Sequence, residues 1–92
     1  MEKKIAFEME GHIPLLTKQQ FKVLNYLNVY HYAEDKLSSI AKNLGIARST
    51  VYGAVEMLQS WGLVYKVVRL EGKPVIYTQI SMKGIGYLKV RY

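Results

Sequence analysis

The sequence predicts a mainly helical α+β domain with a three-helix core, a two-stranded β-hairpin and a short closing helix. Apolar residues recur at helical spacing through most of residues 18–61. After residue 62 the pattern changes to β-branched and aromatic runs on either side of a Gly-containing turn, which favours a hairpin. The chain has 92 residues, of which 50% are hydrophobic, so it can bury one core. We therefore expect residues 1–92 to form a single domain.

The first fifteen residues, 1–15, are expected to form an N-terminal arm or a short strand. Ile5, Phe7 and Met9 alternate with other residues, and a period of two indicates extended chain. The segment from Gly11 onward interrupts this pattern. The arm could pack on the domain or cross to a second subunit.

A first helix is expected over about residues 18–32. Thr17 and Gln20 have the spacing of a capping box, in which each side chain accepts a hydrogen bond from the other residue's backbone N–H. Leu24 and Leu27 are assigned to the core. The helix also carries three tyrosines, which could belong either to the core or to a dimer seam: Tyr26, Tyr30 and Tyr32.

A second helix is expected over residues 38–44, after a polar connection. Ser38 or Ser39 can cap it, because a hydroxyl accepts from a free N–H of the first turn. Gly45 ends it, since glycine takes a positive φ without a Cβ penalty. Just before it, Lys36 and Leu37 are expected to pair briefly with the later hairpin.

A third helix is expected from Ala47 or Arg48 to about residue 60, where Gly62 stops it. Ala41 is small and allows the third helix to cross closely over the second, and Ile46 fills the space between them. Two helices joined by a short Gly-containing turn make a helix-turn-helix.

The uncovered face of the third helix carries mostly short or hydrogen-bonding side chains. Such a face suits a helix that enters the major groove of DNA, where its backbone must approach base edges and phosphates. Helix-turn-helix pairs also occur in plain bundles and in protein-binding modules. The candidate base-reading residues on this face are Arg48, Ser49, Thr50, Tyr52, Gly53 and Glu56.

The hairpin is expected over residues 63–80, with a turn at 71–73 and Pro74 near the start of the second strand, where a missing N–H is tolerated. In the first strand, Val64 and either Val67 or Val68 are expected to face the core.

A last helix is expected from Met82 to about Arg91, capped by Ser81 and docked through Ile85 and Leu88, with its one tyrosine as a further candidate contact. Gly84 and Gly86 are expected to weaken it, because glycine is a poor helix former.

The formal net charge is +6, and the excess is one-sided. Residues 1–35 contain four basic and five acidic residues, whereas residues 36–92 contain nine basic and two acidic ones. The positive half therefore coincides with the helix-turn-helix and the hairpin. A one-sided positive field favours a polyphosphate partner, although a basic surface can also serve solubility alone.

Several classes of function are disfavoured by composition. There is no cysteine, so disulfides, thiolate chemistry and Cys metal sites are excluded. His12 and His31 are not paired at ligand spacing. No nucleophile–base pair or Gly-rich phosphate loop is visible, so we expect no catalytic residue, no enzyme activity, no metal and no cofactor. No apolar run is long enough for a membrane span, and we expect a cytoplasmic protein.

This order of elements resembles the winged helix-turn-helix transcriptional regulators, particularly the compact bacterial and archaeal ones related to MarR and PadR. The resemblance covers residues 16–88 and is most specific in LSSIAKNLGIARSTVYGAVEMLQSWGLV, RLEGKPVIYTQIS and SMKG. Such regulators often have Ser or Thr where this chain has Ala47, so the usual cap is absent and Ser49 is expected to begin the helix instead. The small, Cys-free and Tyr-rich chain is similar to regulators of archaea or their viruses and plasmids.

The resemblance implies a sequence-specific regulator of transcription, a repressor, that binds double-stranded DNA. The third helix would enter the major groove, with Arg48, Ser49 and Tyr52 reading bases. The hairpin would be the wing, whose tip, 69–73, reaches the adjacent minor groove or its phosphates. The residues that would contact the DNA backbone are Lys36, Ser38, Lys42, Lys66, Arg69 and Lys73.

The resemblance also implies a homodimer on a palindromic site, with half-sites about 34 Å apart. It implies a location in the cytoplasm, at the nucleoid, or in the host cytoplasm for a viral or plasmid gene. A small-molecule effector is unknown. The alternative is a winged-helix protein–protein interaction module in a transcription or replication assembly, for which a large apolar patch on the recognition face would be expected. RNA binding is a weaker alternative, because the aromatic residues lie mostly on elements expected to be buried.

Overall fold

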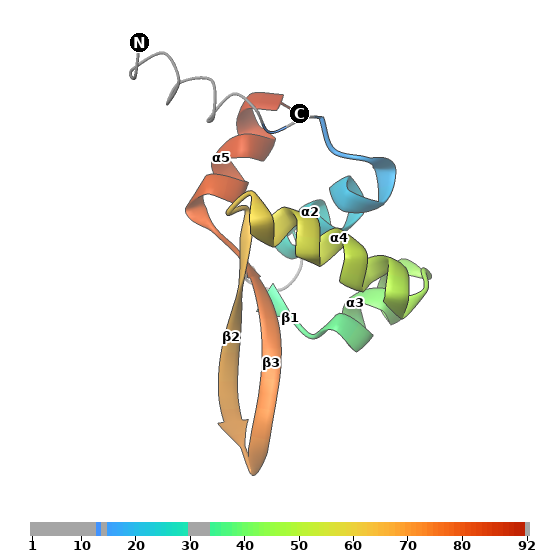
Figure 1. Cartoon of the computed structure of the whole chain (residues 1–92), viewed down its shortest axis with the longest axis vertical. Helices are drawn as coiled ribbons and strands as arrows, with labels where there is room; N and C mark the ends of the chain where they lie inside the picture. The colour runs from blue at the N-terminus through green and yellow to red at the C-terminus, as the bar shows by residue number, and fades with distance from the viewer. Residues whose placement is uncertain (1–12, 14, 30–33, 92) are drawn as a thin grey trace.

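The computed structural model describes residues 13, 15–29 and 34–91, and in this part helices pack against one end of a long hairpin (Figure 1). The expected arm, 1–15, lies almost wholly outside the described residues, as do Tyr30 and Tyr32. The elements, in chain order, are α2 (Lys18–Val29), β1 (Glu34–Asp35), α3 (Leu37–Leu44), α4 (Arg48–Ser60), β2 (Val64–Glu71), β3 (Lys73–Ile80) and α5 (Met82–Arg91).

Helix α2 begins with the expected capping box. The backbone N–H of Thr17 donates to Gln20 Oε1 at 3.0 Å, and the N–H of Gln20 donates to Thr17 Oγ1 at 3.2 Å. The buried face includes Leu24 and Leu27, as predicted, and also Tyr26, which is 5% exposed. Tyr26 therefore belongs to the core rather than to a dimer seam.

Helix α3 ends as predicted but begins differently. Gly45 has φ of 69°, and the N–H of Gly45 and of Ile46 both donate to the Ala41 carbonyl, which satisfies the helix end. The expected serine cap is wrong, because the capping position is Lys36 and no side chain caps it. Lys36 is extended because it follows the paired strand β1. The helix therefore starts at Leu37, one residue before the expected start at Ser38.

The strand before α3 pairs with β3, although not at the residues expected. The pairs are Glu34 with Gln79 and Asp35 with Thr78, so the expected pairing of Lys36 and Leu37 is wrong. Those two residues already turn into α3, which leaves only the preceding dipeptide extended. The pairing fixes where α3 starts relative to the hairpin.

Helix α4 crosses α3 after the short turn, as predicted for a helix-turn-helix. It begins at Arg48, one of the two starts expected from the sequence. Ala47 is its N-cap and has no side-chain hydrogen bond, so the expectation from the resemblance that Ser49 begins the helix is wrong. Its end is a Schellman motif. Gly62, with φ of 76°, donates to the Gln59 carbonyl, and Leu63 donates to the Leu58 carbonyl.

Strands β2 and β3 form the wing. They belong to an antiparallel sheet of order β1-β3-β2, in which β3 is the central strand. Val64 and Ile80 at its base are buried. Beyond its base the wing projects away from the helices (Figure 1). The expectation that Val67 or Val68 reaches the core is wrong for Val68, which is 60% exposed, and Val67 is only half-buried. The outer half of the hairpin has no helix to pack against.

Helix α5 closes the domain at the end opposite the wing tip (Figure 1). Ser81 caps it as predicted, accepting from the Gly84 N–H at 3.0 Å. Its docking through Leu88 and half-buried Ile85 is confirmed. The view that Gly84 only weakens the helix is wrong. A Cβ there would collide with the Leu63 carbonyl oxygen and lie 2.8 Å from Ile80 Cγ1, so this glycine allows α5 to pack on the hairpin base.

Candidate nucleic-acid interface

The outer face of α4 is exposed to solvent, because the opposite face of the helix is buried in the core. Val51, Ala54, Val55 and Leu58 are buried at helical spacing. The six predicted base-reading residues are all exposed, and Tyr52, the largest of them, is 53% exposed. They are Arg48, Ser49, Thr50, Tyr52, Gly53 and Glu56. A helix with this outer face can meet a polar partner.

A cleft of about 310 Å³ lies where the start of α3, the start of α4 and the base of the wing meet. We call it the basic cleft, because three of the lining side chains are cations. Its lining residues are Lys36, Leu37, Ser38, Arg48, Tyr52, Lys66, Ile76 and Thr78. The cleft thus brings together five predicted DNA-contacting side chains, which are Lys36, Ser38, Arg48, Tyr52 and Lys66. Converging cations and hydroxyls suit a strip of phosphate groups.

Lys66 occupies a specific position at the joint between α4 and the wing. Its Nζ lies 3.3 Å from Glu56 Oε2 and 5.8 Å from the centroid of the Tyr52 ring. The two helix residues are four positions apart and therefore share one face. Sequence analysis placed Glu56 among the candidate base-reading residues and missed the cation that neutralises it.

The wing carries a second polar cluster nearer its tip. The Arg69 guanidinium lies over the Tyr77 ring, 5.6 Å from its centroid, and the Tyr77 hydroxyl donates to the Glu71 carboxylate at 3.2 Å. Arg69 is therefore held along the wing. Lys73 is exposed beside Gly72, whose φ of 81° makes the turn.

The remaining predicted backbone contact, Lys42, is exposed in the last turn of α3 and does not line the basic cleft. It belongs to the same helix as Ser38, which lies at the other end. Arg69 and Lys73 also lie outside the cleft, toward the wing tip. The predicted residues are therefore spread from α3 across the cleft to the tip.

A buried hydrogen-bond chain fixes the start of α3, and sequence analysis missed it. The Tyr26 hydroxyl donates to Asp35 Oδ2 at 2.7 Å and accepts from Asn43 Nδ2 at 2.7 Å. Asp35 Oδ1 accepts from the Lys36 N–H at 2.8 Å. Burial raises the pKa of the Tyr26 hydroxyl, and the hydrogen bond to the Asp35 carboxylate raises it further. This chain ties α2 and β1 to the helix that lines the basic cleft.

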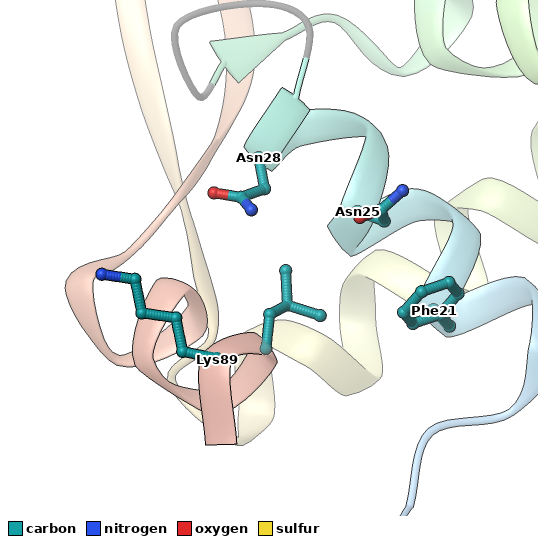
Figure 2. Close-up of a pocket in the computed structure, with 5 residues that line it drawn as sticks. Phe21, Asn25, Asn28 and Lys89 are labelled. Carbon is teal, nitrogen blue, oxygen red and sulfur yellow. The ribbon is translucent and has the colours of Figure 1, made fainter. Parts of the chain in front are cut away.

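A second hollow, of about 250 Å³, lies between α2 and α5. Figure 2 shows Asn25 and Asn28 on α2, with Lys89 on α5 across the hollow. Phe21 and Leu88 complete the lining. It lies away from the wing, and sequence analysis gave no signal for it because its sides come from helices far apart in the chain.

Residues 13, 15–29 and 34–91 contain neither a metal-ligand cluster nor a membrane-spanning helix. No three His, Asp or Glu side chains there are grouped so that they could share a metal ion. Within the same residues, no helix has the length and apolar character needed to cross a bilayer.

Comparison with known proteins gives one family. The family model described as "Sugar-specific transcriptional regulator TrmB" matches residues 16–83, which include α2, the helix-turn-helix and the wing. No curated protein sequence matches the chain.

Several solved structures share the fold. A MarR family protein from Bacillus stearothermophilus aligns with a TM-score of 0.70 at 24% identity, over 96% of this chain and 59% of that one. Lactococcus lactis ZitR, as a point mutant in complex with DNA, aligns with a TM-score of 0.68 at 23% identity, over 80% and 49%. A MarR-like transcriptional regulator from Thermotoga maritima aligns with a TM-score of 0.69 at 16% identity, over 94% and 64%.

These likenesses confirm the predicted MarR-like winged helix-turn-helix fold. This chain spans roughly half to two thirds of the length of those structures.

Proposed function

Because the chain belongs to the TrmB family of transcriptional regulators, we propose that it binds double-stranded DNA sequence-specifically and represses transcription by occupying promoter DNA. The single observation that carries this proposal is the basic cleft, in which Lys36, Arg48 and Lys66 converge beside the exposed polar face of α4. The structure of ZitR in complex with DNA supports it by analogy of fold. The function is binding, with no catalytic step.

The outer face of α4 is proposed to read bases in the major groove. Arg48 is long enough to take the paired acceptors of a guanine, and Ser49 and Tyr52 offer hydroxyl groups beside it. Thr50 and Gly53 are small or short and leave the helix backbone free to approach. Such contacts carry sequence information, unlike phosphate contacts.

The basic cleft is proposed to hold the sugar–phosphate backbone beside that major groove. Lys36 and Ser38 flank the start of α3, and Lys66 lies on the opposite wall. Lys42 would meet the backbone farther along α3. Arg69 and Lys73 would reach the phosphates of the adjacent minor groove, because the wing projects from the domain (Figure 1).

A homodimer on a palindromic site is part of the proposal. Exposed apolar side chains on α2 and α5 support it, namely Val29 and Val90, which are 57% and 83% exposed. Two recognition helices in such a dimer would read half-sites about 34 Å apart. We place the regulator in the cytoplasm, at the nucleoid, because that is where its DNA partner lies.

The alternative proposal is a protein–protein interaction module. One observation favours it, namely the exposed apolar side chains of Val68, Leu70 and Ile76 on the wing. The recognition face of α4 does not favour it, since its exposed residues are polar, charged or small.

The experiment that tests the proposal is selection of a preferred duplex from random sequences, followed by anisotropy titrations with variants. Arg48→Ala is expected to weaken binding to the preferred duplex far more than to a random one. The matched control is Lys73→Ala, which is expected to weaken binding to both duplexes alike and to reduce the salt slope by about one phosphate. Failure to select any preferred sequence contradicts the proposal.

A further inference from the structure

Both ends of α3 are tied to a single atom, the hydroxyl oxygen of Tyr26 on α2. This hydroxyl donates to Asp35 Oδ2 and accepts from Asn43 Nδ2, each at 2.7 Å. Asp35 belongs to the strand that precedes α3, and Asn43 lies in the last turn of the helix. We call these three side chains the α3 clamp. They hold α3 to α2 at two points rather than one.

The carboxylate of the α3 clamp makes it rigid. Asp35 is 9% exposed, and a buried charge is costly unless hydrogen bonds compensate it. Its two oxygens accept separately, Oδ2 from Tyr26 and Oδ1 from the Lys36 N–H. Hydrogen bonds to an ionised acceptor are shorter and stronger than neutral ones. A displacement of α3 would lengthen them and leave the charge less compensated, so the α3 clamp opposes it.

The α3 clamp adjoins the basic cleft. Across the three strands of the sheet, Asp35 pairs with Thr78, and Thr78 pairs with Lys66. Thr78 and Lys66 both line the cleft, and so does Lys36, the residue after Asp35. The clamped strand β1 therefore connects the wall of the cleft that carries Lys36 to the wall that carries Lys66.

Helix α3 depends on the α3 clamp more than α4 depends on any polar contact. Only two residues of α3 are buried, Ile40 and Ala41, whereas α4 buries four along its length. Apolar packing therefore fixes the recognition helix more firmly than it fixes α3. Lys36 and Lys42 are exposed near opposite ends of α3, so their positions follow any movement of this helix.

We infer that Tyr26 is a positioning residue for DNA binding, because its hydroxyl holds α3 where Lys36 and Lys42 meet DNA phosphates. The effect passes through Asp35 and Asn43. Tyr26 itself is 5% exposed and does not touch the duplex. This inference rests on the proposed function and deepens it, since it separates the residues that contact phosphates from the residue that places them.

Salt dependence and sequence preference distinguish positioning from stability. Each phosphate that a lysine neutralises adds about 0.9 to the slope of log affinity against log salt concentration. A protein whose α3 is displaced loses such contacts, and its slope becomes shallower. A protein that only unfolds more readily keeps the slope of its folded fraction. Contacts that carry sequence information are proposed to belong to α4, so the preference for one duplex should remain.

The test compares the wild type with Tyr26→Phe by fluorescence anisotropy on the preferred duplex and on a random one. Titrations are made at several salt concentrations and at a temperature where thermal unfolding shows both proteins folded. Phenylalanine keeps the ring and the net charge and removes only the hydroxyl. The expected result is a slope shallower by about 0.9–1.8, for one or two phosphates, with affinity about tenfold lower at low salt. The ratio of the two affinities should stay unchanged.

Two controls isolate the role of the hydroxyl. Tyr87→Phe makes the same chemical change at another buried tyrosine, which lies on α5 and does not line the basic cleft. It should leave the salt slope unchanged. The second control repeats Tyr26→Phe in a Lys36→Ala/Lys42→Ala background. Neither lysine is then present to be positioned, so the substitution should change affinity little.

Each outcome decides one point. Equal slopes for the wild type and Tyr26→Phe overturn the inference and leave the DNA-binding proposal standing. Equal losses with and without the two lysines overturn it as well, because the hydroxyl would then act on other contacts. A shallower slope for Tyr87→Phe also contradicts it, since the effect would not be specific to the α3 clamp. Absence of wild-type binding to either duplex overturns the proposed function itself.

Discussion

Lys66 Nζ lies 3.3 Å from Glu56 Oε2, and this ion pair joins the base of the wing to the outer face of α4. Both side chains are partly exposed, at 32% and 46%, so the pair itself contributes little to stability, at most about 1 kcal/mol. Its consequence is electrostatic. It neutralises the acidic group on the recognition face, and it reduces the charge that Lys66 can offer to the phosphates proposed to lie in the basic cleft.

Glu56→Gln is therefore predicted to tighten binding to random duplex DNA. The released Lys66 can neutralise one more phosphate, so the salt slope should become steeper by about 0.9. In a Lys66→Met background the same substitution should give a much smaller gain, because no lysine is released. Anisotropy titrations of the four proteins measure this cycle, and equal gains in both backgrounds would contradict the coupling.

Gly53→Ala is predicted to separate stability from DNA binding. Gly53 is exposed within α4, and a Cβ there meets nothing within 4 Å, so alanine should raise the free energy of unfolding by about 0.5–1 kcal/mol. The added methyl group would stand between α4 and the base edges, and affinity for the preferred duplex should fall. Urea unfolding and anisotropy measure the two effects. An unchanged affinity would place Gly53 outside the groove.

Two glycines of α5 are predicted to respond in opposite directions. Gly84→Ala should destabilise the domain by at least about 1 kcal/mol, because its Cβ would collide with the Leu63 carbonyl and Ile80. Gly86→Ala meets nothing within 4 Å and should stabilise the helix by about 0.5–1 kcal/mol. Thermal unfolding of both variants measures this. Stabilisation by both would show that α5 packs less closely on the hairpin.

Tyr26→Phe is predicted to destabilise the domain by about 1–3 kcal/mol at neutral pH, because it removes the hydroxyl that links Asp35 and Asn43 in the hydrogen-bond chain. The pKa of Tyr26 is raised above its ordinary value of 10.0. The unfolded chain therefore loses this proton first, and the stabilisation is complete below pH 10 and is lost as the pH rises through the higher folded-state value. The difference between wild type and variant in urea unfolding should shrink above pH 10. A constant difference would contradict the assignment.

Most of the fold was predictable because local signals coincide with the element boundaries. Gly45, Gly62 and Gly72 all adopt positive φ at the positions where the sequence predicted the ends of two helices and the hairpin turn. The apolar spacing of α4 identified its buried face. The remaining face of α4 was therefore predicted to be exposed, and it carries the candidate base-reading residues. Their role in reading DNA stays a prediction.

What was missed depends on contacts between elements. Lys66 and Glu56 meet only because the wing base packs beside α4, and Gly84 matters only because α5 approaches Leu63. The start of α3 was misjudged, and the resemblance misplaced the start of α4 at Ser49, because neither helix has the side-chain cap that sequence reasoning looks for. The exposure of Val68 reflects how far the wing projects, and strand periodicity carries no information about that.

The most direct test of the central claim is fluorescence anisotropy of a labelled random duplex, titrated with the protein at several salt concentrations. The basic surface predicts binding that weakens steeply as salt rises, with log affinity linear in log salt concentration and a slope that corresponds to several phosphates. Folded protein that fails to bind the duplex even at low salt would contradict the DNA-binding account.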